Sequence, residues 1–179
     1  MTLLTRRKSI ASLVAAAGVS GLLMTSAPNS AADTAAPAPK NCAVLVGKAP
    51  TNGKPSPELY RYCSTKSAAD ARAHLETKAA AGGRSAQATL LMVWYANTDY
   101  RTPSTSVYGN AGPCDSSGYS LHPDSYWSQN ISSARGYNRC TVATFHNRAL
   151  NFATTFRLPV PYLGANLNDN VGLIQTWYG

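Results

Sequence analysis

The sequence predicts an all-β fold that carries a small N-terminal hairpin-plus-helix appendage. From Thr89 onward the chain is rich in Tyr, Trp, Thr, Val and Ser, with Gly, Asn and Pro between short apolar runs and no sustained helical period. Two strand-like runs, ending at Tyr95 and Phe145, are each followed by a turn that contains Asn. Such spacing is typical of an antiparallel sandwich with half-buried strands.

The first residues read as an export signal. A basic run at 6–8 precedes an apolar stretch at 10–23 and a zone of small residues at 29–32. We therefore predict a secretory signal peptide over 1–32, followed by an extended Ala/Pro-rich leader over 33–40. The apolar stretch is shorter than the roughly 20 residues of a membrane span, so secretion is favoured over stable membrane anchoring. Both the general and the twin-arginine export routes stay open.

The charge of the chain is only moderately basic. The net charge is +8, and without the three bases of the signal the mature part has 13 basic and 8 acidic residues. Nucleic-acid-binding domains concentrate Lys and Arg on one face or along one stripe. No basic run occurs after the signal, so we expect no nucleic-acid partner.

The four cysteines are expected to form disulfides. The chain is small, reads as exported and has no Cys-x-x-Cys spacing, which disfavours a zinc site or thiol chemistry. Three pairings are open, and we favour Cys42 with Cys63 and Cys114 with Cys140, since each pair closes a short loop within one half of the chain. Each bond would stabilise the fold by about 3 kcal/mol in a chain-entropy picture.

Residues 41–84 are predicted to form a disulfide-stapled hairpin and a helix, set apart from a β-domain over 85–179. Ala43–Val46 and Leu59–Tyr62 read as short strands on either side of a Pro/Gly/Asn loop. Ser67–Ala81 reads as a helix capped by its first residue, with too thin an apolar face to support a core alone. We expect an appendage packed on the β-domain or a partly disordered segment, and its role as pro-segment, cap or integral layer stays open. The apolar line of the helix is Ala71, Leu75 and Ala79.

The β-domain shows signs of an internal duplication. Each half begins with a strand-like run and ends with a polar turn that leads into an apolar run. A shift of forty positions aligns the two ends, with a longer loop around 109–123 in the first half. The aligned pairs are Trp127 with Leu167, Asn130 with Asn170, Ile131 with Val171 and Ser132 with Gly172.

These paired units resemble the two Greek-key motifs of a βγ-crystallin domain. The likeness covers Leu90–Trp177 and is strongest for the small secreted actinobacterial branch that includes metalloproteinase inhibitors and killer-toxin-like proteins. Tyr95 and Tyr100 match the family's aromatic pair, although Thr102 stands where the family has Gly. The resemblance implies a two-motif sandwich in which each aromatic pair folds a hairpin over the sheets.

The family's calcium signature is split between the two halves of this chain. The first half keeps the hydroxyls, among them Ser132, whereas the second keeps the amides and the carboxylate. Calcium takes six to eight oxygens and usually more than one carboxylate. We therefore expect no cofactor and interpret the cluster as a turn closed by its own side chains, with calcium as the alternative. The degenerate calcium set is Ser132, Asn168, Asp169 and Asn170.

Catalysis is not expected. The histidines are His74, His122 and His146, and only His122 has an acid and several serines close by in sequence. There is no Gly-x-Ser-x-Gly elbow and no metal-ligand spacing, and such polar residues are ordinary turn content. We therefore predict a non-enzymatic protein.

The loop Gly109–Ser125, held by the second cysteine pair, is the predicted contact surface of a secreted monomer. A disulfide lowers the ordering cost of binding. The resemblance implies a protease inhibitor, in particular of metalloproteases, with an extracellular protease as its partner. The alternatives are an antimicrobial, killer-toxin-like or cell-wall protein that binds polysaccharide, and a structural extracellular protein without a discrete site. The candidate contact residues are Tyr108, Asn110, Asp115, Tyr119, His122 and Tyr126.

Overall fold

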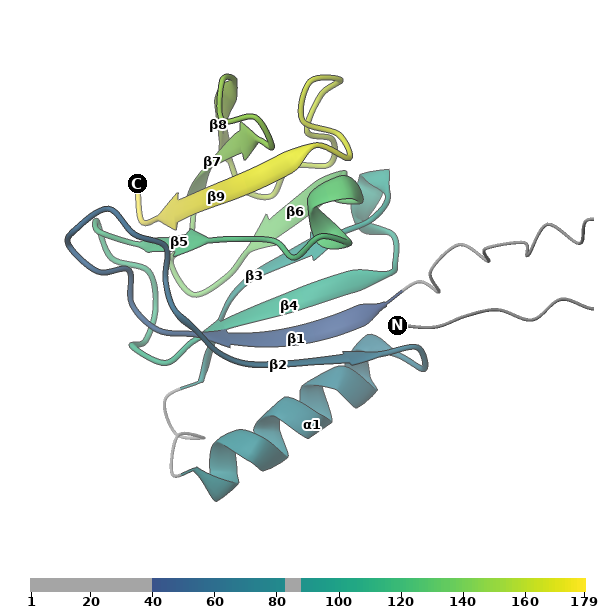
Figure 1. Cartoon of the computed structure of the whole chain (residues 1–179), viewed down its shortest axis with the longest axis vertical. Coiled ribbons are helices and arrows are strands. Elements are labelled where there is room, and N and C mark those ends of the chain that lie inside the picture. The colour runs from purple at the N-terminus through teal and green to yellow at the C-terminus, as the bar shows by residue number, and fades with distance from the viewer. Residues whose placement is uncertain (1–39, 83–87) are drawn as a thin grey trace, which may run out of the picture. The chain divides into compact units, whose positions relative to one another are not determined.

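The computed structural model describes residues 40–82 and 88–179. The predicted signal peptide, almost all of the leader and the boundary expected at residue 84 lie outside these ranges. The described residues form two β-sheets and one α-helix, joined by loops and two short 3-10 helices. Figure 1 shows the order of the layers, with the helix on one side of the first sheet and the second sheet on the other. The prediction of an all-β fold is confirmed at this level.

The first sheet, sheet A, has five strands in the order β2-β1-β4-β3-β6. All neighbours are antiparallel except β1 and β4, which run parallel. The parallel pair joins the two parts of the chain that the sequence suggested were separate. The strands are β1 (Asn41–Val46), β2 (Glu58–Ser64), β3 (Thr89–Tyr95), β4 (Ser104–Gly109) and β6 (Ser133–Gly136).

The second sheet, sheet B, has four antiparallel strands in the order β5-β9-β7-β8. An isolated bridge between Ala134 and Val160 ties the segment after β8 to β6 of sheet A. The 3-10 helices η2 (Thr98–Tyr100) and η3 (Trp127–Gln129) lie in the connections. The strands of sheet B are β5 (Tyr119–Leu121), β7 (Val142–Asn147), β8 (Ala153–Arg157) and β9 (Val171–Trp177).

Strand β1 is buried on both faces. Cys42, Val44 and Val46 belong to the core between the sheets. Ala43 and Leu45 belong to a second core beneath the helix. A continuous apolar run suits a strand covered on both sides, whereas a one-sided strand alternates. Strands β1 and β2 therefore belong to sheet A, which favours the integral layer among the roles that the sequence left open for this segment.

The helix α1 (Ala68–Ala81) covers the outer face of sheet A. The Ser67 side chain accepts a hydrogen bond from the backbone N–H of Asp70 at 3.0 Å, which confirms the predicted N-cap. The buried residues of the helix are the predicted line of Ala71, Leu75 and Ala79. Leu75 is fully buried against the sheet, so one large side chain and two small ones bring the helix close to the strands.

The core between the sheets is built from large side chains of both layers. Trp94 of β3, Trp127 of η3 and Phe145 of β7 are almost completely buried. Ile131 and Val171, which the forty-residue shift aligned, are both fully buried; Ile131 precedes β6, whereas Val171 is the first residue of β9.

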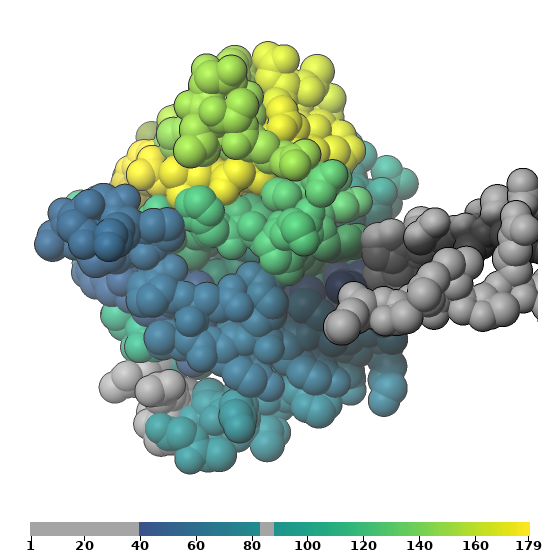
Figure 2. Space-filling model, in the orientation of Figure 1, coloured from purple at the N-terminus to yellow at the C-terminus, as the bar shows by residue number. Residues whose placement is uncertain are grey.

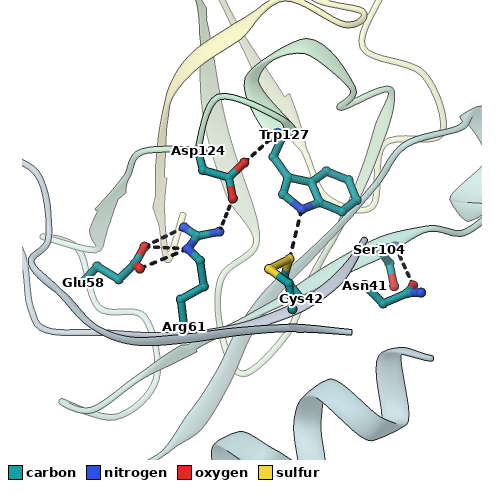
Figure 3. The surroundings of a disulfide bond; sticks show 8 residues. Asn41, Cys42, Glu58, Arg61, Ser104, Asp124 and Trp127 are labelled. Carbon is teal, nitrogen blue, oxygen red and sulfur yellow. Dashed lines mark hydrogen bonds and ion pairs between the residues drawn. A yellow bond between two sulfur atoms is a disulfide. The ribbon is translucent and has the colours of Figure 1, made fainter. Parts of the chain in front are cut away.

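Both predicted disulfides are present. Cys42 is bonded to Cys63 across β1 and β2, and Cys114 is bonded to Cys140. Figure 3 shows the first bond, where the indole Nε1–H of Trp127 points at Cys42 Sγ, 3.5 Å away. The Cys42–Cys63 disulfide therefore links β1 to β2 and also packs against the core between the sheets.

Candidate functional site

Two of the tyrosines expected at the contact surface are buried. Tyr108 lies under α1 in the core between helix and sheet, and Tyr119 lies between the sheets, where its hydroxyl donates to the carbonyl of Gly112 at 2.8 Å. Burial raises the pKa of both phenols. Neither ring stands on an exposed surface, which corrects the prediction. The inward placement follows from the strand registers, which sequence spacing alone does not reveal.

The other four predicted residues do not form one surface. Asn110 is half-buried and donates its backbone N–H to Val46. Tyr126 is half-buried with its ring edge-on to Trp127, at 5.4 Å between centroids. His122 is exposed and follows β5, whereas Asp115 precedes β5, so the two residues lie at opposite ends of that strand. Only Asp115 stays at the tip of the disulfide loop.

Asp115 holds that tip together. Its carboxylate accepts hydrogen bonds from the backbone N–H groups of Ser117 at 3.0 Å and Gly118 at 2.8 Å, and pairs with the ammonium of Lys48. The hydrogen bond from Lys48, with the backbone donors, lowers the pKa of Asp115 to about 2. Gly118 has φ +61°, and a Cβ there would overlap the carbonyl oxygen of Thr176. The loop is thus held by the ion pair with Lys48 and by hydrogen bonds from two backbone N–H groups to Asp115. Gly118 is required because the chain passes too close to the Thr176 carbonyl for a Cβ.

The degenerate calcium set is only partly assembled. Ser132 Oγ lies 3.3 Å from Asp169 Oδ1, and the Asn168 amide donates to Asp169 Oδ2 at 2.6 Å. Asn170 instead donates to the backbone carbonyl of Asn166, which closes the turn. Burial raises the pKa of Asp169. One carboxylate, already hydrogen-bonded twice, gives little charge to attract a divalent cation.

The candidate site emerges on the outer face of sheet B. No described helix covers this face, whereas α1 covers the outer face of sheet A. One polar residue from each strand of sheet B lies in the same register row, and each is paired with the next across the sheet. In the order of the strands these residues are Ser120, Gln175, Thr144 and Thr155. The two threonine hydroxyls lie 2.7 Å apart, and the Gln175 side chain meets His146 at 3.2 Å. A polar row therefore crosses the whole sheet.

A cleft of about 240 Å³ opens at the β5 edge of this row. One wall is the loop between β1 and β2, with Pro50 and Lys54, and the other comes from Ser117 and the end of β9. The half-buried indole of Trp177 lines the cleft beside Gln175. Figure 2 shows the dark blue loop standing beside the green of β5 and the yellow of β9. The cleft combines an aromatic surface with hydroxyl, amide and ammonium groups.

The walls of the cleft are fastened to sheet B. The backbone N–H of Ser56 donates to the carbonyl of Ser120 at 2.8 Å, and the Ser56 hydroxyl accepts from the N–H of Ser120 at 3.1 Å. The Lys48–Asp115 pair links the same loop to the disulfide loop. The carbonyl of Asp115 in turn accepts from the N–H of Tyr178 after β9. The cleft is therefore pre-formed, which lowers the cost of ordering it around a ligand.

Sequence reasoning missed Trp177 and Gln175. The run from Val171 to Trp177 does not alternate strictly between apolar and polar residues, so its pattern does not say which set faces the core. Thr176 is buried and Gln175 exposed, so a polar residue lies on each face. Gln175 and Ser120 become neighbours only through the pairing of β5 with β9, so no local sequence pattern indicates that they share a site.

A group of metal-ligand residue types occurs elsewhere, around Cys42, Cys63 and Asp124. Both sulfurs are consumed by the disulfide, so this group offers one carboxylate and no thiolate. Within residues 40–82 and 88–179, no helix has the length and apolar character needed to cross a membrane. The comparisons with protein-family models, curated proteins and solved structures find no match.

Proposed function

We propose that the chain is an exported βγ-crystallin-like protein built from two Greek-key motifs. The first motif comprises β3 to β6, and the second comprises β7 to β9 with the bridge at Val160. In each motif the second strand in the chain pairs with the first, and the first pairs with the last, as β4-β3-β6 and β8-β7-β9. The third segment of each motif pairs with the other sheet: β5 pairs with β9, and Val160 bridges to β6. This exchange of one segment between the sheets supports a double Greek key.

The corners of the two units support the same proposal. Tyr95 and Tyr100 meet edge-to-face, with ring centroids 5.8 Å apart. Tyr100 and Leu150, which stand five residues after Tyr95 and Phe145, both have positive φ, at 63° and 56°. The two disulfides suit an oxidising environment, which supports export. Recovery of the mature chain from culture medium and sequencing of its first residue would test export directly.

The activity that the geometry favours is binding of a cell-envelope polysaccharide by the outer face of sheet B. The observation that carries this proposal is the pre-formed cleft in which Trp177 stands beside Gln175, Ser117 and Ser120. An aromatic ring offers a flat apolar surface to one face of a sugar, while amide and hydroxyl groups hydrogen-bond to its hydroxyls. The polar row across β9, β7 and β8 extends this surface for further sugar units.

The test is co-sedimentation of the full mature chain with insoluble polymers, namely peptidoglycan, chitin and cellulose. The Trp177→Ala variant is expected to lose at least tenfold in affinity, because a buried aromatic anchor contributes about 2 kcal/mol to an interface. Trp177→Phe, which keeps a ring, should retain part of the binding. Tyr162→Ala is the matched control, since Tyr162 is an exposed aromatic outside the cleft. Equal binding by both alanine variants, or no binding of the native chain to any polymer, would exclude the proposal.

Protease inhibition is the second candidate, and one observation favours it. Ser116 and Ser117 are exposed at a loop tip that is fixed by the Cys114–Cys140 bond and by Asp115. A rigid exposed tip is what a protease cleft can grip without ordering it. Assays with thermolysin-like and serine proteases should show inhibition that weakens in Asp115→Asn but not in Lys78→Ala. Full protease activity at micromolar excess of the chain would remove this candidate.

A further inference from the structure

Charged residues are unevenly distributed around sheet B. The stretch 125–168 contains four arginines and no Asp or Glu. Three of these arginines belong to the part of the chain that forms sheet B, namely Arg139 before β7, Arg148 after β7 and Arg157 at the end of β8. The four described strands of sheet B contain no acidic residue. The proposed polysaccharide face therefore belongs to a layer with an excess of positive charge.

Arg157 stands on the outer face of sheet B, in the same register row as Trp177. Phe156 packs on the core between the sheets, so its neighbours Thr155 and Arg157 point outward. Val142 of β7 is paired with Arg157 on one side and with Trp177 on the other. Two strand spacings, or about 10 Å, therefore separate the backbones of Arg157 and Trp177.

A second cation lies on the other side of Trp177. Lys54, in the loop between β1 and β2, lines the cleft together with Trp177. Lys54 and Arg157 are both exposed, and neither makes an ion pair among the described residues. His146 lies on the same face beside Gln175 and is neutral or positive. The cleft and the row are thus bordered at both ends by cations that are free to meet an anionic group.

At the Trp177 end of the sheet, positive groups outnumber negative ones. Asp115 is paired with Lys48, so the charges of these two cancel. Gly179 brings one carboxylate, and its carbonyl oxygen accepts from the Thr141 hydroxyl. Three unpaired cations stand against that carboxylate, which leaves a formal charge of about two positive when His146 is neutral. The three cations are Lys54, Arg157 and Arg139, and the last lies over the ring of Tyr178 at 4.3 Å.

The acidic residues at the opposite end of sheet B are engaged in other contacts. Asp169 accepts hydrogen bonds from two neighbouring side chains in the turn before β9. Asp124, which follows β5, shares the guanidinium of Arg61 with Glu58 of β2. His122 lines the same cavity as Arg61 and adds no negative charge. These carboxylates do not offset the positive charge beside Trp177, because their partners hold them away from the cleft.

We propose that the polysaccharide bound by this face is anionic, with carboxylate or phosphate groups on its sugar units. This inference rests on the polysaccharide binding proposed above and names the class of polymer. One sugar ring stacks on Trp177, and the anionic groups of neighbouring units meet Lys54 on one side and Arg157 on the other. The planar guanidinium can pair with two oxygens of a carboxylate or a phosphate. A neutral polymer gains nothing from either cation.

The experiment compares matched charged and neutral polymers by isothermal titration of the full mature chain. Polygalacturonate is paired with its methyl ester, and dextran phosphate with dextran, so that each pair differs in its anionic groups. The charged member of at least one pair should bind about 2- to 30-fold more tightly, the share of two exposed charge pairs. This preference should shrink as the salt concentration rises. The pair with the larger preference distinguishes carboxylate from phosphate.

Two variants make the test specific. Arg157→Gln should lower the affinity for the charged polymer about 2- to 5-fold and leave that for the neutral polymer unchanged. Arg72→Gln is the matched control, because it removes the same charge from an exposed position on α1, which covers the other sheet. Equal losses in the two variants would overturn the inference, since they would reflect net charge alone.

The polymers also separate this inference from the proposed function. Equal affinity for the charged and neutral members of both pairs would overturn the anionic class and leave polysaccharide binding standing. Absence of binding to every polymer, charged or neutral, would instead remove the proposed function, and the inference with it.

Discussion

Sheet A is covered on both faces, whereas sheet B is covered on one. In sheet A, successive residues of β1 enter two different cores. In sheet B, Phe145 of β7 faces the core while its neighbours Thr144 and His146 face outward. Both sheets therefore contribute large side chains to the core between them, and among the described residues only sheet B has a face without a second core. The outer face of sheet B, which no described helix covers, carries the polar row and the cleft.

The largest effect that tests this comparison is expected at β7. Phe145→Ala should lower the free energy of unfolding by about 3–5 kcal/mol, because it removes a fully buried ring from the core between the sheets. The adjacent Thr144→Ala should change it by less than about 0.5 kcal/mol, as is usual on a surface. Urea unfolding followed by tryptophan fluorescence measures both. A similar loss for the two variants would contradict the one-sided picture of sheet B.

The next effect concerns the second face of sheet A. Leu75→Ala should cost about 2–4 kcal/mol, because Leu75 is the one large, fully buried side chain that α1 places on the sheet. Lys78→Ala on the same helix is the matched control. If the helix is an integral layer, far-UV circular dichroism and tryptophan fluorescence should give the same unfolding midpoint. A separate early transition by circular dichroism would show that α1 is dispensable.

A smaller effect is expected at the loop that borders sheet B. The pKa of Asp115 is lowered from 3.8 to about 2, chiefly by Lys48. A lowered carboxyl pKa stabilises the folded state above about pH 4, and this contribution disappears as the pH falls through about 2. Because both side chains are about half exposed, Asp115→Asn should cost less than about 1 kcal/mol at pH 7. Thermal melts at pH 7, 4 and 2 should show the difference shrinking toward pH 2.

The smallest effect has the opposite sign. Burial raises the pKa of Asp169, so the ionised carboxylate is disfavoured in the folded protein. Asp169→Asn should leave stability at pH 7 equal or raised by a few tenths of a kcal/mol, since the amide oxygen still accepts from Ser132 and the partly exposed Asn168 amide can turn its oxygen toward the new N–H. The advantage should vanish once the pH falls through the raised pKa to below 3.8, where the carboxyl is protonated in both states. Melts with and without calcium chloride complete the test. A calcium-dependent rise that is present in the native chain and lost in the variant would identify a metal ligand instead of a turn.

Local signals in the sequence predicted the local structure well. Ser67 capped the predicted helix, and the cysteine spacing predicted both disulfides. The parallel pairing of β1 with β4 was not predictable in the same way, because it joins residues more than 60 positions apart with no turn between them to fix their register. The doubly apolar run from Cys42 to Val46 was the available sign of a strand covered on both faces.

The site was harder to predict than the fold. Tyr108 and Tyr119 looked like contact residues, but the direction of each side chain depends on a register that one sequence does not encode locally. Gln175 and Ser120 are neighbours because β5 pairs with β9 of sheet B, and nothing near either residue in the sequence indicates this pairing. The residues that line a cleft between distant segments share no motif, so physical reasoning needs the topology before it can find them.

The parallel β1–β4 contact also has a consequence for the order of folding. The hairpin of β1 and β2 can close as soon as residue 64 has left the ribosome, but its place in the sheet does not exist until β4 has been made. Until then one edge and two apolar faces stand open to other chains. Folding limited by such distant pairings takes milliseconds to seconds, so completion of sheet A depends on when β4 becomes available.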